Sequence, residues 1–171
     1  VVLVVGDVAS APVALAPFFS PIIVLFFGGF LLAEAMRRVG LDQLAASRIV
    51  ALSGGGPFRL YLTFLGVAAV ASMWMSNTAA VAVLLPIAMA VTSSVTDESY
   101  RRAVVLGAAY AATVGGVGSA IGTPANQLAI SFLDDVVGTE ISFVRWFAFG
   151  LPAVLLLLAP VAGWVWFRFS P

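Results

Sequence analysis

The sequence contains no cysteine and no histidine, all of its basic residues are arginine, and charged residues make up only 9% of the chain. Without thiol or imidazole side chains, the sequence excludes a cysteine nucleophile, a Ser–His dyad, a zinc site built on those ligands and a disulfide framework. The formal net charge is +0 and the arginines are scattered, so the basic surface that binds nucleic acid is also missing. These absences exclude the common intramembrane serine-protease and zinc-protease chemistries, and we expect no nucleic acid as a partner. The wider expectation is a protein that is not an enzyme and carries no organic cofactor.

Apolar residues dominate what is present. Hydrophobic residues make up 62% of the sequence, and its mean hydropathy is +1.12. A soluble domain carries roughly a quarter charged residues, because it must cover its surface with them. The composition therefore predicts an integral membrane protein of the all-α polytopic class, embedded in a lipid bilayer. Its expected location is a prokaryotic cytoplasmic (inner) membrane.

Four uncharged segments outline the predicted membrane elements: residues 8–33, 60–96, 103–133 and 146–167. One helical crossing needs about 20 apolar residues. The first and last segments match single spans. The two middle segments are too long for one straight span and too short for two spans with a proper turn, so each is expected to contain an interruption.

Both interruptions are visible as polar or helix-breaking residues. Ser76, Asn77 and Thr78 lie at the centre of the second segment between apolar flanks, which predicts a helical hairpin with a polar tip at membrane depth. Residues 115–124 (GGVGSAIGTP) interrupt the third segment and predict a broken helix with halves at about 102–114 and 124–133. Non-helical backbone at that depth is tolerated only where it is buried in protein or lines a polar cavity. Each interruption therefore predicts a binding site.

The arginines predict how the chain crosses the membrane. Arginines precede the hairpin between residues 37 and 59 and follow it at 101–102, so the positive-inside rule places both linkers in the cytoplasm. A re-entrant hairpin satisfies this placement, and so do two full spans. Acidic residues of the 134–140 loop then lie outside and Arg168 inside, whereas Arg145 is the exception.

This topology divides the chain into four parts. The expected parts are scaffold-type spans with a cytoplasmic linker (1–59), a re-entrant hairpin (60–96), a linker with broken helix and outer loop (97–145), and a final span (146–171).

The two interruptions carry residues suited to binding an anion and a cation. Thr78 or Asn77 is expected to cap the second hairpin arm, and Thr123 followed by Pro124 matches the start of a helix. A helix N-terminus binds anions through its free N–H groups and its dipole, so two such ends predict a carboxylate-bearing substrate. Unwound carbonyls such as that of Gly122 offer oxygen ligands to Na⁺.

Sodium is the expected coupling ion. Ser72 lies one helical turn before Ser76, so both hydroxyls are expected to face the same ion. The four uncharged segments contain no Asp, Glu, Lys or His, the residues on which proton relays depend.

Several stretches resemble the divalent anion:sodium symporter family of dicarboxylate, citrate and sulfate permeases. Residues 73–80 (MWMSNTAA) followed by 84–86 (LLP) resemble its hairpin signature. Residues 110–116 (YAATVGG) with 122–126 (GTPAN) are similar to its broken-helix signature, and 27–32 (FGGFLL) to the preceding span.

The resemblance implies sodium-coupled symport of a small divalent anion by a homodimer that moves as an elevator. It implies that Na⁺ is bound by Ser72, Ser76, Asn77 and the Gly122 carbonyl, and that Asn77, Thr78, Thr123 and Pro124 contact the substrate.

Two features depart from the family pattern. Ala125 stands where the loop usually has a second proline, which loosens the local backbone. The family carries two inverted repeats, whereas this sequence contains one hairpin and one broken helix, matching the N-terminal repeat. Because the sequence also begins inside an apolar run, we expect a fragment whose partner is the second inverted-repeat half. The alternative is a half-size protomer that pairs in opposite orientation.

Other functions stay open at this stage. A cation:proton antiporter or an arsenite-type anion exporter of the same superfamily would need a titratable residue in the missing half. A non-transporting membrane assembly module would use the polar interruptions only to pack against its neighbours. A channel is less favoured, because the sequence shows no ring of charge and no repeated filter.

Overall fold

The computed structural model describes residues 56–93 and 95–169 without a break, residues 10–15, and isolated residues or short runs between 6 and 54. The regular elements within these residues are all helical, which confirms the all-α part of the predicted fold class for the described part of the chain. They are α2 (Ala11–Leu15), α5 (Pro57–Ser72), α6 (Asn77–Val91), α7 (Glu98–Gly115), the 3₁₀ helix η2 (Gly116–Gly118), α8 (Pro124–Val137) and α9 (Phe143–Phe169). Most of the predicted first span lies outside the described residues.

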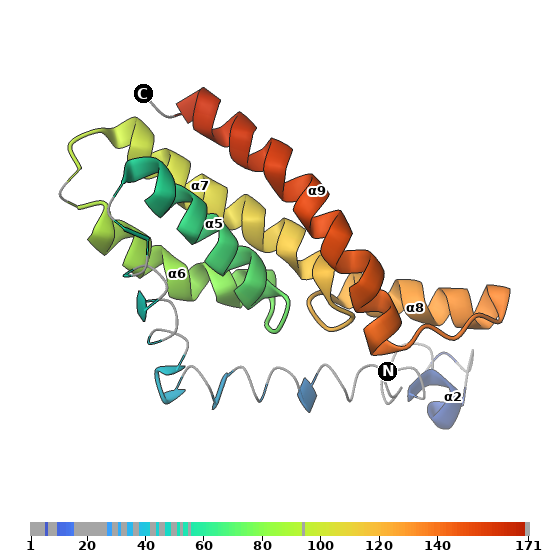
Figure 1. The fold of residues 1–171 in the computed structure, drawn as a ribbon. Coiled ribbons are helices and arrows are strands. Elements are labelled where there is room, and N and C mark those ends of the chain that lie inside the picture. The colour runs from blue at the N-terminus through green and yellow to red at the C-terminus, as the bar shows by residue number, and fades with distance from the viewer. Residues whose placement is uncertain are drawn as a thin grey trace.

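Helices α5 and α6 form a hairpin, and Figure 1 shows them side by side with a short turn between them. Helix α5 begins at Pro57, because proline at the first helical position loses no hydrogen bond there. It ends at Ser72, and residues 73–76 form the turn. The polar triplet predicted to form the tip is thus divided: Ser76 belongs to the turn, whereas Asn77 and Thr78 open α6.

Helix α7 lies at the centre of the bundle and packs against α5, α6 and α9. Two glycines allow α5 to approach closely. A Cβ atom on Gly107 would lie 2.7 Å from side-chain carbons of both Tyr61 and Leu65, and one on Gly115 would overlap the backbone of Ala69. Small residues at such contacts are typical of helix pairs that pack in lipid, where close van der Waals contact holds the helices together.

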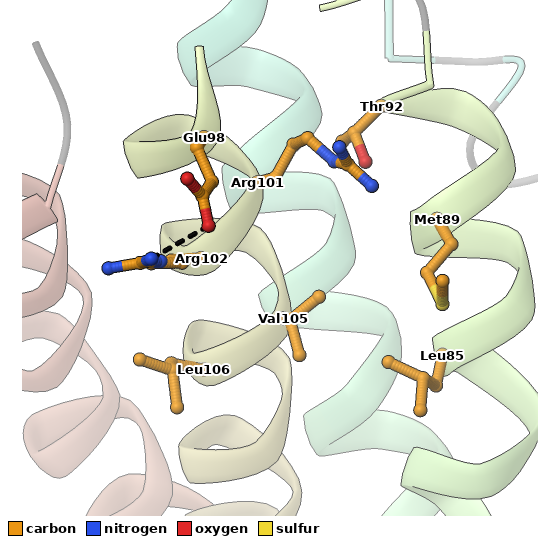
Figure 2. A pocket seen from close by; sticks show the side chains of 8 residues that line it. All are labelled: Leu85, Met89, Thr92, Glu98, Arg101, Arg102, Val105 and Leu106. Carbon is orange, nitrogen blue, oxygen red and sulfur yellow. Dashed lines mark hydrogen bonds and ion pairs between the residues drawn. The ribbon is translucent and has the colours of Figure 1, made fainter. Parts of the chain in front are cut away.

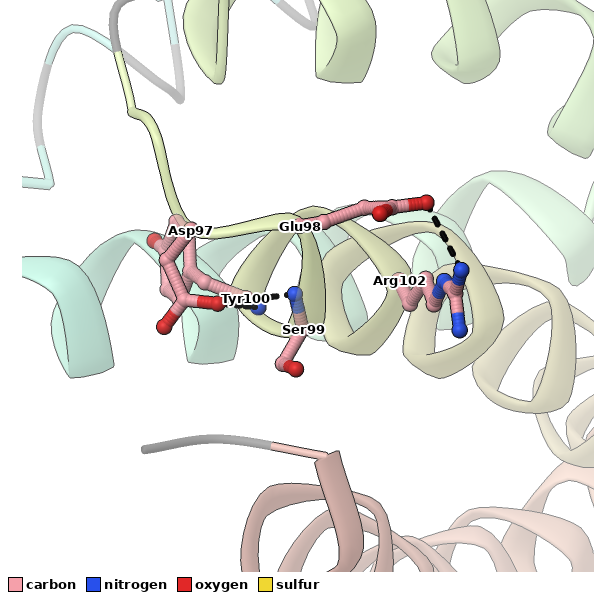
Figure 3. Close-up of polar contacts among 5 residues, drawn as sticks. All are labelled: Asp97, Glu98, Ser99, Tyr100 and Arg102. Carbon is pink, nitrogen blue, oxygen red and sulfur yellow. Dashed lines mark hydrogen bonds and ion pairs between the residues drawn. The ribbon is translucent and has the colours of Figure 1, made fainter.

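The ends of α7 and α8 follow from their capping residues. Asp97 caps α7 by accepting hydrogen bonds from the backbone N–H groups of Ser99 (2.8 Å) and Tyr100 (3.4 Å), as Figure 3 shows. Helix α8 ends at Val137 and is followed by Gly138, whose φ of 66° is the left-handed conformation common at helix C-termini. Both helices therefore extend beyond the halves expected at 102–114 and 124–133.

Between α7 and α8 the chain leaves the α-helical conformation. It forms η2 and then continues through residues 119–123 before Pro124 opens α8. This interval corresponds to the glycine-rich run of the sequence. Figure 1 shows the resulting loop at the same end of the bundle as the turn between α5 and α6.

Among the described helices, α9 alone is both long and apolar enough to cross a membrane, whereas α5 and α6 are apolar but shorter. Helix α9 contains Pro152 and Pro160, and α6 contains Pro86. Prolines inside membrane helices are tolerated because neighbouring helices and local adjustments satisfy the freed backbone groups.

The opposite end of the bundle is built from aromatic residues. The Tyr61 hydroxyl donates to the Ala162 carbonyl (2.8 Å), and the Tyr100 hydroxyl donates to the Pro57 carbonyl (2.7 Å). The ring of Trp166 lies 6.3 Å from that of Tyr100, centroid to centroid. These contacts bring the starts of α5 and α7 to the end of α9 (Figure 1). This end carries four arginines: Arg59, Arg101, Arg102 and Arg168.

Candidate functional site

Ser76, the last residue of the turn between α5 and α6, caps the N-terminus of α6. Its Oγ accepts a hydrogen bond from the backbone N–H of Ala79 (3.2 Å), three residues into the following helix. The expectation that Asn77 or Thr78 caps this helix is therefore wrong, because both already belong to its first turn. Thr78 is exposed there.

Ser72 and Asn77 close the turn from its two sides. The Ser72 hydroxyl donates to Asn77 Oδ1 (2.5 Å), and the Ser72 residue is fully buried. Because α5 ends at Ser72, this residue and Ser76 do not share one helix, contrary to the expected one-turn spacing. The two hydroxyls have different partners, namely the Asn77 side chain and the Ala79 backbone.

A serine on the α7–α8 loop connects the loop to the turn. The buried Ser119 hydroxyl donates to the carbonyl oxygen of Met73. A Cβ atom on Gly118 would lie 2.8 Å from Cε of the same methionine, so the loop rests on the turn without a gap. The two interruptions of the sequence therefore contact each other directly.

Two buried amides at the start of α8 hold the loop in shape. Asn126 Nδ2 donates to the carbonyls of both Gly116 and Ser119, at 2.7 Å each. Gln127 Nε2 donates to the carbonyl of Ala120 at 2.8 Å. Buried backbone carbonyls outside regular structure need such donors, since leaving them unpaired is costly.

Gly116 and Gly122 mark the place where the turn and the loop come closest. A Cβ atom on Gly116 would lie 2.5 Å from Asn77 Oδ1. One on Gly122 would overlap the Gly116 carbonyl and lie 2.9 Å from the Ser72 carbonyl. Three of the four residues predicted to bind sodium, Ser72, Asn77 and Gly122, are thus gathered around Gly116. Ser76 caps α6 instead.

The residues predicted to contact substrate lie where α6 and α8 begin. Thr123 precedes α8 in an extended conformation (φ −147°, ψ 146°), and Pro124 occupies the first turn. The Thr123 hydroxyl makes no capping hydrogen bond, so the expected side-chain cap is absent here and the hydroxyl is available to another acceptor. Thr123 is half-buried, whereas Pro124 is exposed.

Helix α9 also contacts the α7–α8 loop. Trp146 Nε1 donates to the Val117 carbonyl (3.1 Å). A Cβ atom on Gly150 would lie 2.8 Å from the carbonyl oxygens of both Val117 and Gly118, so only glycine allows α9 to come this close. The loop is held by three elements: the α5–α6 turn, α8 and α9.

The residues around Gly116 fit a sodium ion. Ser72 offers a hydroxyl, Asn77 an amide oxygen and Gly122 a carbonyl, all of them neutral oxygen donors of the kind that hold Na⁺ at interrupted helices. Gly116 and Gly122 allow these residues to approach one another, because a Cβ atom on either glycine would collide with them. The described residues contain no group of three or more His, Cys, Asp or Glu that could hold a metal ion.

The sequence-based prediction of the site missed Ser119, Asn126 and Gln127 as structural contributors. Each is buried, and each bonds a backbone carbonyl of the turn or the loop. A usable signal was present, because Asn126 and Gln127 are adjacent amides directly after a helix start in an otherwise apolar chain.

A helical bundle with two interruptions that meet in a buried polar seam is suited to a membrane transport protein, in which irregular backbone lies inside the protein. A family model described as "Citrate transporter" matches residues 1–171, and the chain belongs to that family. The sequence resemblance to the divalent anion permeases is thereby confirmed.

Named relatives agree with this assignment. The chain is 39% identical to an uncharacterized transporter of Haemophilus influenzae over 95% of its length. It is 35% identical to the sodium-dependent dicarboxylate transporter SdcS of Staphylococcus saprophyticus, and 33% identical to SdcS of Staphylococcus aureus (strain USA300), each over 99% of its length. In all three comparisons it covers 34% of the relative, so the chain spans about a third of the length of these relatives.

Proposed function

We propose that this chain forms one inverted-repeat half of a sodium-coupled symporter for a small divalent anion in the cytoplasmic membrane of a prokaryote. The observation that carries the proposal is the meeting of Ser72, Asn77 and Gly122 around Gly116. Neutral oxygens from two interrupted helical segments converge there, beside the starts of two helices. The names of the SdcS relatives support sodium as the coupling ion.

In this proposal Na⁺ is held by the Ser72 hydroxyl, the Asn77 amide oxygen and the Gly122 carbonyl, with Ser76 as the fourth predicted ligand. When bound, the ion supplies positive charge beside the anion and couples its movement to the sodium gradient. The hydrogen bond from Ser72 to Asn77 Oδ1 already orients that amide oxygen toward the turn. Asn77 thus belongs to both predicted sets, because its amide group has an oxygen for the ion and an N–H₂ donor for a carboxylate.

The proposed substrate site lies at the starts of α6 and α8. Asn77 and Thr78 contribute from the first turn of α6, and Thr123 and Pro124 from the start of α8. The first N–H groups of a helix have no intrahelical partner, and the helix dipole adds partial positive charge. Two such helix starts suit a dicarboxylate, and the family description adds citrate as a substrate to test.

We propose further that α5 and α6 form a re-entrant hairpin. They contain 16 and 15 residues. At about 1.5 Å per residue each arm is about 24 Å long, shorter than a hydrocarbon core of about 30 Å. The four arginines at the open end of the hairpin support a cytoplasmic position for that end. Helices α7 and α8 then form the broken transmembrane helix, within the predicted part 97–145. Helix α9 forms the final span and begins three residues before the predicted part 146–171.

An elevator movement and a homodimer complete the proposal. Both are implied by the family resemblance. The packing of α5, α6 and α7 into one bundle is compatible with a transport domain that moves as a unit. The second inverted-repeat half supplies the remaining part of the substrate site.

Uptake of labelled succinate into proteoliposomes tests the proposal, using the native-length polypeptide. We expect accumulation under an inward sodium gradient and its loss when potassium replaces sodium. Citrate and sulfate serve as further substrates. Uptake that follows a pH gradient and ignores sodium would favour the antiporter instead, and absence of any uptake or ligand binding would favour an assembly module.

A glycine pair tests the site itself. In Gly116→Ala the new methyl group displaces the Asn77 amide, a flexible group, so we expect a folded protein that has lost sodium-dependent uptake by at least tenfold. Gly66→Ala is the matched control, because no atom lies within 4 Å of its added Cβ. Equal sodium dependence in Gly116→Ala and the control would refute the proposed site.

A further inference from the structure

An open cavity lies between α6 and α7, far along the bundle from the candidate site. Its volume is about 470 Å³, and Figure 2 shows the side chains that line it. They are Leu85, Met89, Thr92, Glu98, Arg101, Arg102, Val105 and Leu106. None of them is a proposed ligand of the sodium ion or of the substrate.

The lining is divided along the helix axis into a charged end and an apolar end. Glu98, Arg101 and Arg102 occupy the first turns of α7, whereas Val105 and Leu106 follow one turn deeper. The apolar side is continued from α6 by Leu85 and Met89, which is half-exposed. Figure 2 shows the same order, with the charged groups above the apolar ones. The cavity therefore changes from charged to apolar along the axis of α7.

The lining carries one net positive charge. Arg102 is paired with Glu98 through Nη2 and Oε1 at 2.7 Å (Figures 2 and 3). Arg101 forms no ion pair within the described residues, and its guanidinium points from α7 toward Thr92 in Figure 2. Asp97 is occupied at the helix N-terminus by the N–H groups of Ser99 and Tyr100 and does not line the cavity. Arg101 is thus the group left to bind an anion.

We propose that this cavity binds the headgroup and upper acyl chain of an anionic phospholipid. The phosphate is recognised by Arg101, and the acyl chain lies against Met89, Leu85 and Leu106. Basic cavities between membrane helices on the cytoplasmic side are suited to such headgroups, because the inner leaflet is rich in anionic lipid. The assignment of the cavity to the inner leaflet rests on the proposed membrane orientation. Binding of the lipid itself does not depend on transport.

Lipid titration by native mass spectrometry tests the proposal on the native-length polypeptide in detergent. The probes are phosphatidylglycerol and phosphatidylcholine with identical acyl chains. We expect tighter binding of phosphatidylglycerol by about fivefold, and Arg101→Gln should remove this preference. Arg101→Lys keeps the charge and should retain most of the preference for phosphatidylglycerol.

A second variant tests the apolar end. Met89→Trp fills the apolar part of the cavity without changing its charge, so phosphatidylglycerol binding should fall by a similar factor. Arg145→Gln is the matched control, since Arg145 is an exposed arginine near the start of α9, away from the cavity, and should leave binding unchanged.

Several outcomes would overturn the lipid site. Equal binding of the two lipids would show that charge plays no part. Absence of specific binding in the wild-type polypeptide would show that other protein segments cover the cavity. Retention of the preference in Arg101→Gln, or an equal loss in Arg145→Gln, would show that the anionic lipid binds elsewhere. Unchanged binding in Met89→Trp would place the acyl chain outside the cavity. Because lipid binding is measured without a sodium gradient, these results are independent of the symport proposal.

Discussion

Asn126 is the side chain on which the shape of the α7–α8 loop most depends. It is 6% exposed, and its single NH₂ group pairs with two carbonyls that lie three residues apart, those of Gly116 and Ser119. Both carbonyls belong to residues that contact the hairpin turn. Asn126 therefore acts on the proposed sodium site through the backbone.

Replacing this amide should weaken sodium binding. Asn126→Ala leaves two buried carbonyls without a donor, at a cost of about 1–3 kcal/mol each in the folded loop. We expect the sodium concentration for half-maximal uptake to rise about tenfold, since about 1.4 kcal/mol corresponds to that factor. Sodium titration of succinate uptake measures the shift. Thr113→Ala, which removes an exposed hydroxyl from α7, is the control; an equal shift in both variants would contradict the role of Asn126.

Residue-scale details mark the limit of what the sequence can predict. Ser72, Ser76, Asn77 and Gly122 were predicted as one set. The structure gathers all of them but Ser76 around Gly116, because each lies at a helix interruption. The cap of α6 and the partners of Ser119 depend on where α5 ends and on contacts between residues far apart in sequence. Ser119 and Met73 are separated by 46 residues, and no local pattern encodes that contact.

At the scale of elements, hydrogen bonds from tyrosines join helices at the aromatic end of the bundle. Tyr61 on α5 is fully buried and donates to the Ala162 carbonyl on α9. Tyr110 on α7 is half-exposed and provides a comparison within the same chain. The bond from Tyr61 ties the final helix to the hairpin across 101 residues of sequence.

Loss of this hydroxyl should lower stability measurably. We expect Tyr61→Phe to decrease the free energy of unfolding by about 0.5–1.5 kcal/mol, the usual net contribution of one such bond. Equilibrium unfolding in mixed detergent micelles provides the measurement. Tyr110→Phe should change the free energy of unfolding by less than half as much as Tyr61→Phe. A larger change in Tyr110→Phe than in Tyr61→Phe would contradict this role of Tyr61.

Helices were easier to predict than their ends. The uncharged segments located the hairpin, the glycine-rich interval and the final helix, because apolar length and helix-breaking residues are local properties. The extent of α7 back to Glu98 follows from the Asp97 cap, and that of α8 forward to Val137 follows from Gly138. Charge gaps do not detect such caps, so the predicted halves were too short.

At the scale of the whole molecule, the two ends of the bundle differ in net charge, although Asp97 and Glu98 accompany the arginines and Arg145 lies near the acidic residues. Arg59, Arg101, Arg102 and Arg168 lie at the end where α7 begins and α9 finishes. The acidic residues Asp134, Asp135 and Glu140 lie beyond the interrupted loop, on α8 and the segment that follows it. The orientation predicted from the sequence rests on this difference in charge.

Because residues 1–171 contain no cysteine, single cysteines can report the orientation directly. Glu140→Cys and Thr96→Cys both alter exposed residues. In intact cells that make the native-length polypeptide, with any cysteine outside residues 1–171 replaced, an impermeant maleimide should label Cys at 140 and spare Cys at 96. Permeabilised cells should label both. The reverse pattern in intact cells would invert the proposed topology.

The hydrogen bond between the Ser119 hydroxyl and the Met73 carbonyl has a thermodynamic consequence. Together with the contact of Gly122 on the Ser72 carbonyl, it makes both sides of the proposed ion site parts of a single packed unit. Under the proposed elevator movement, the ion would keep the same coordinating atoms throughout its passage. Its intrinsic dissociation constant would then be equal at the two membrane faces, so the occupancy of the site on each side would follow the local concentrations of sodium and anion alone.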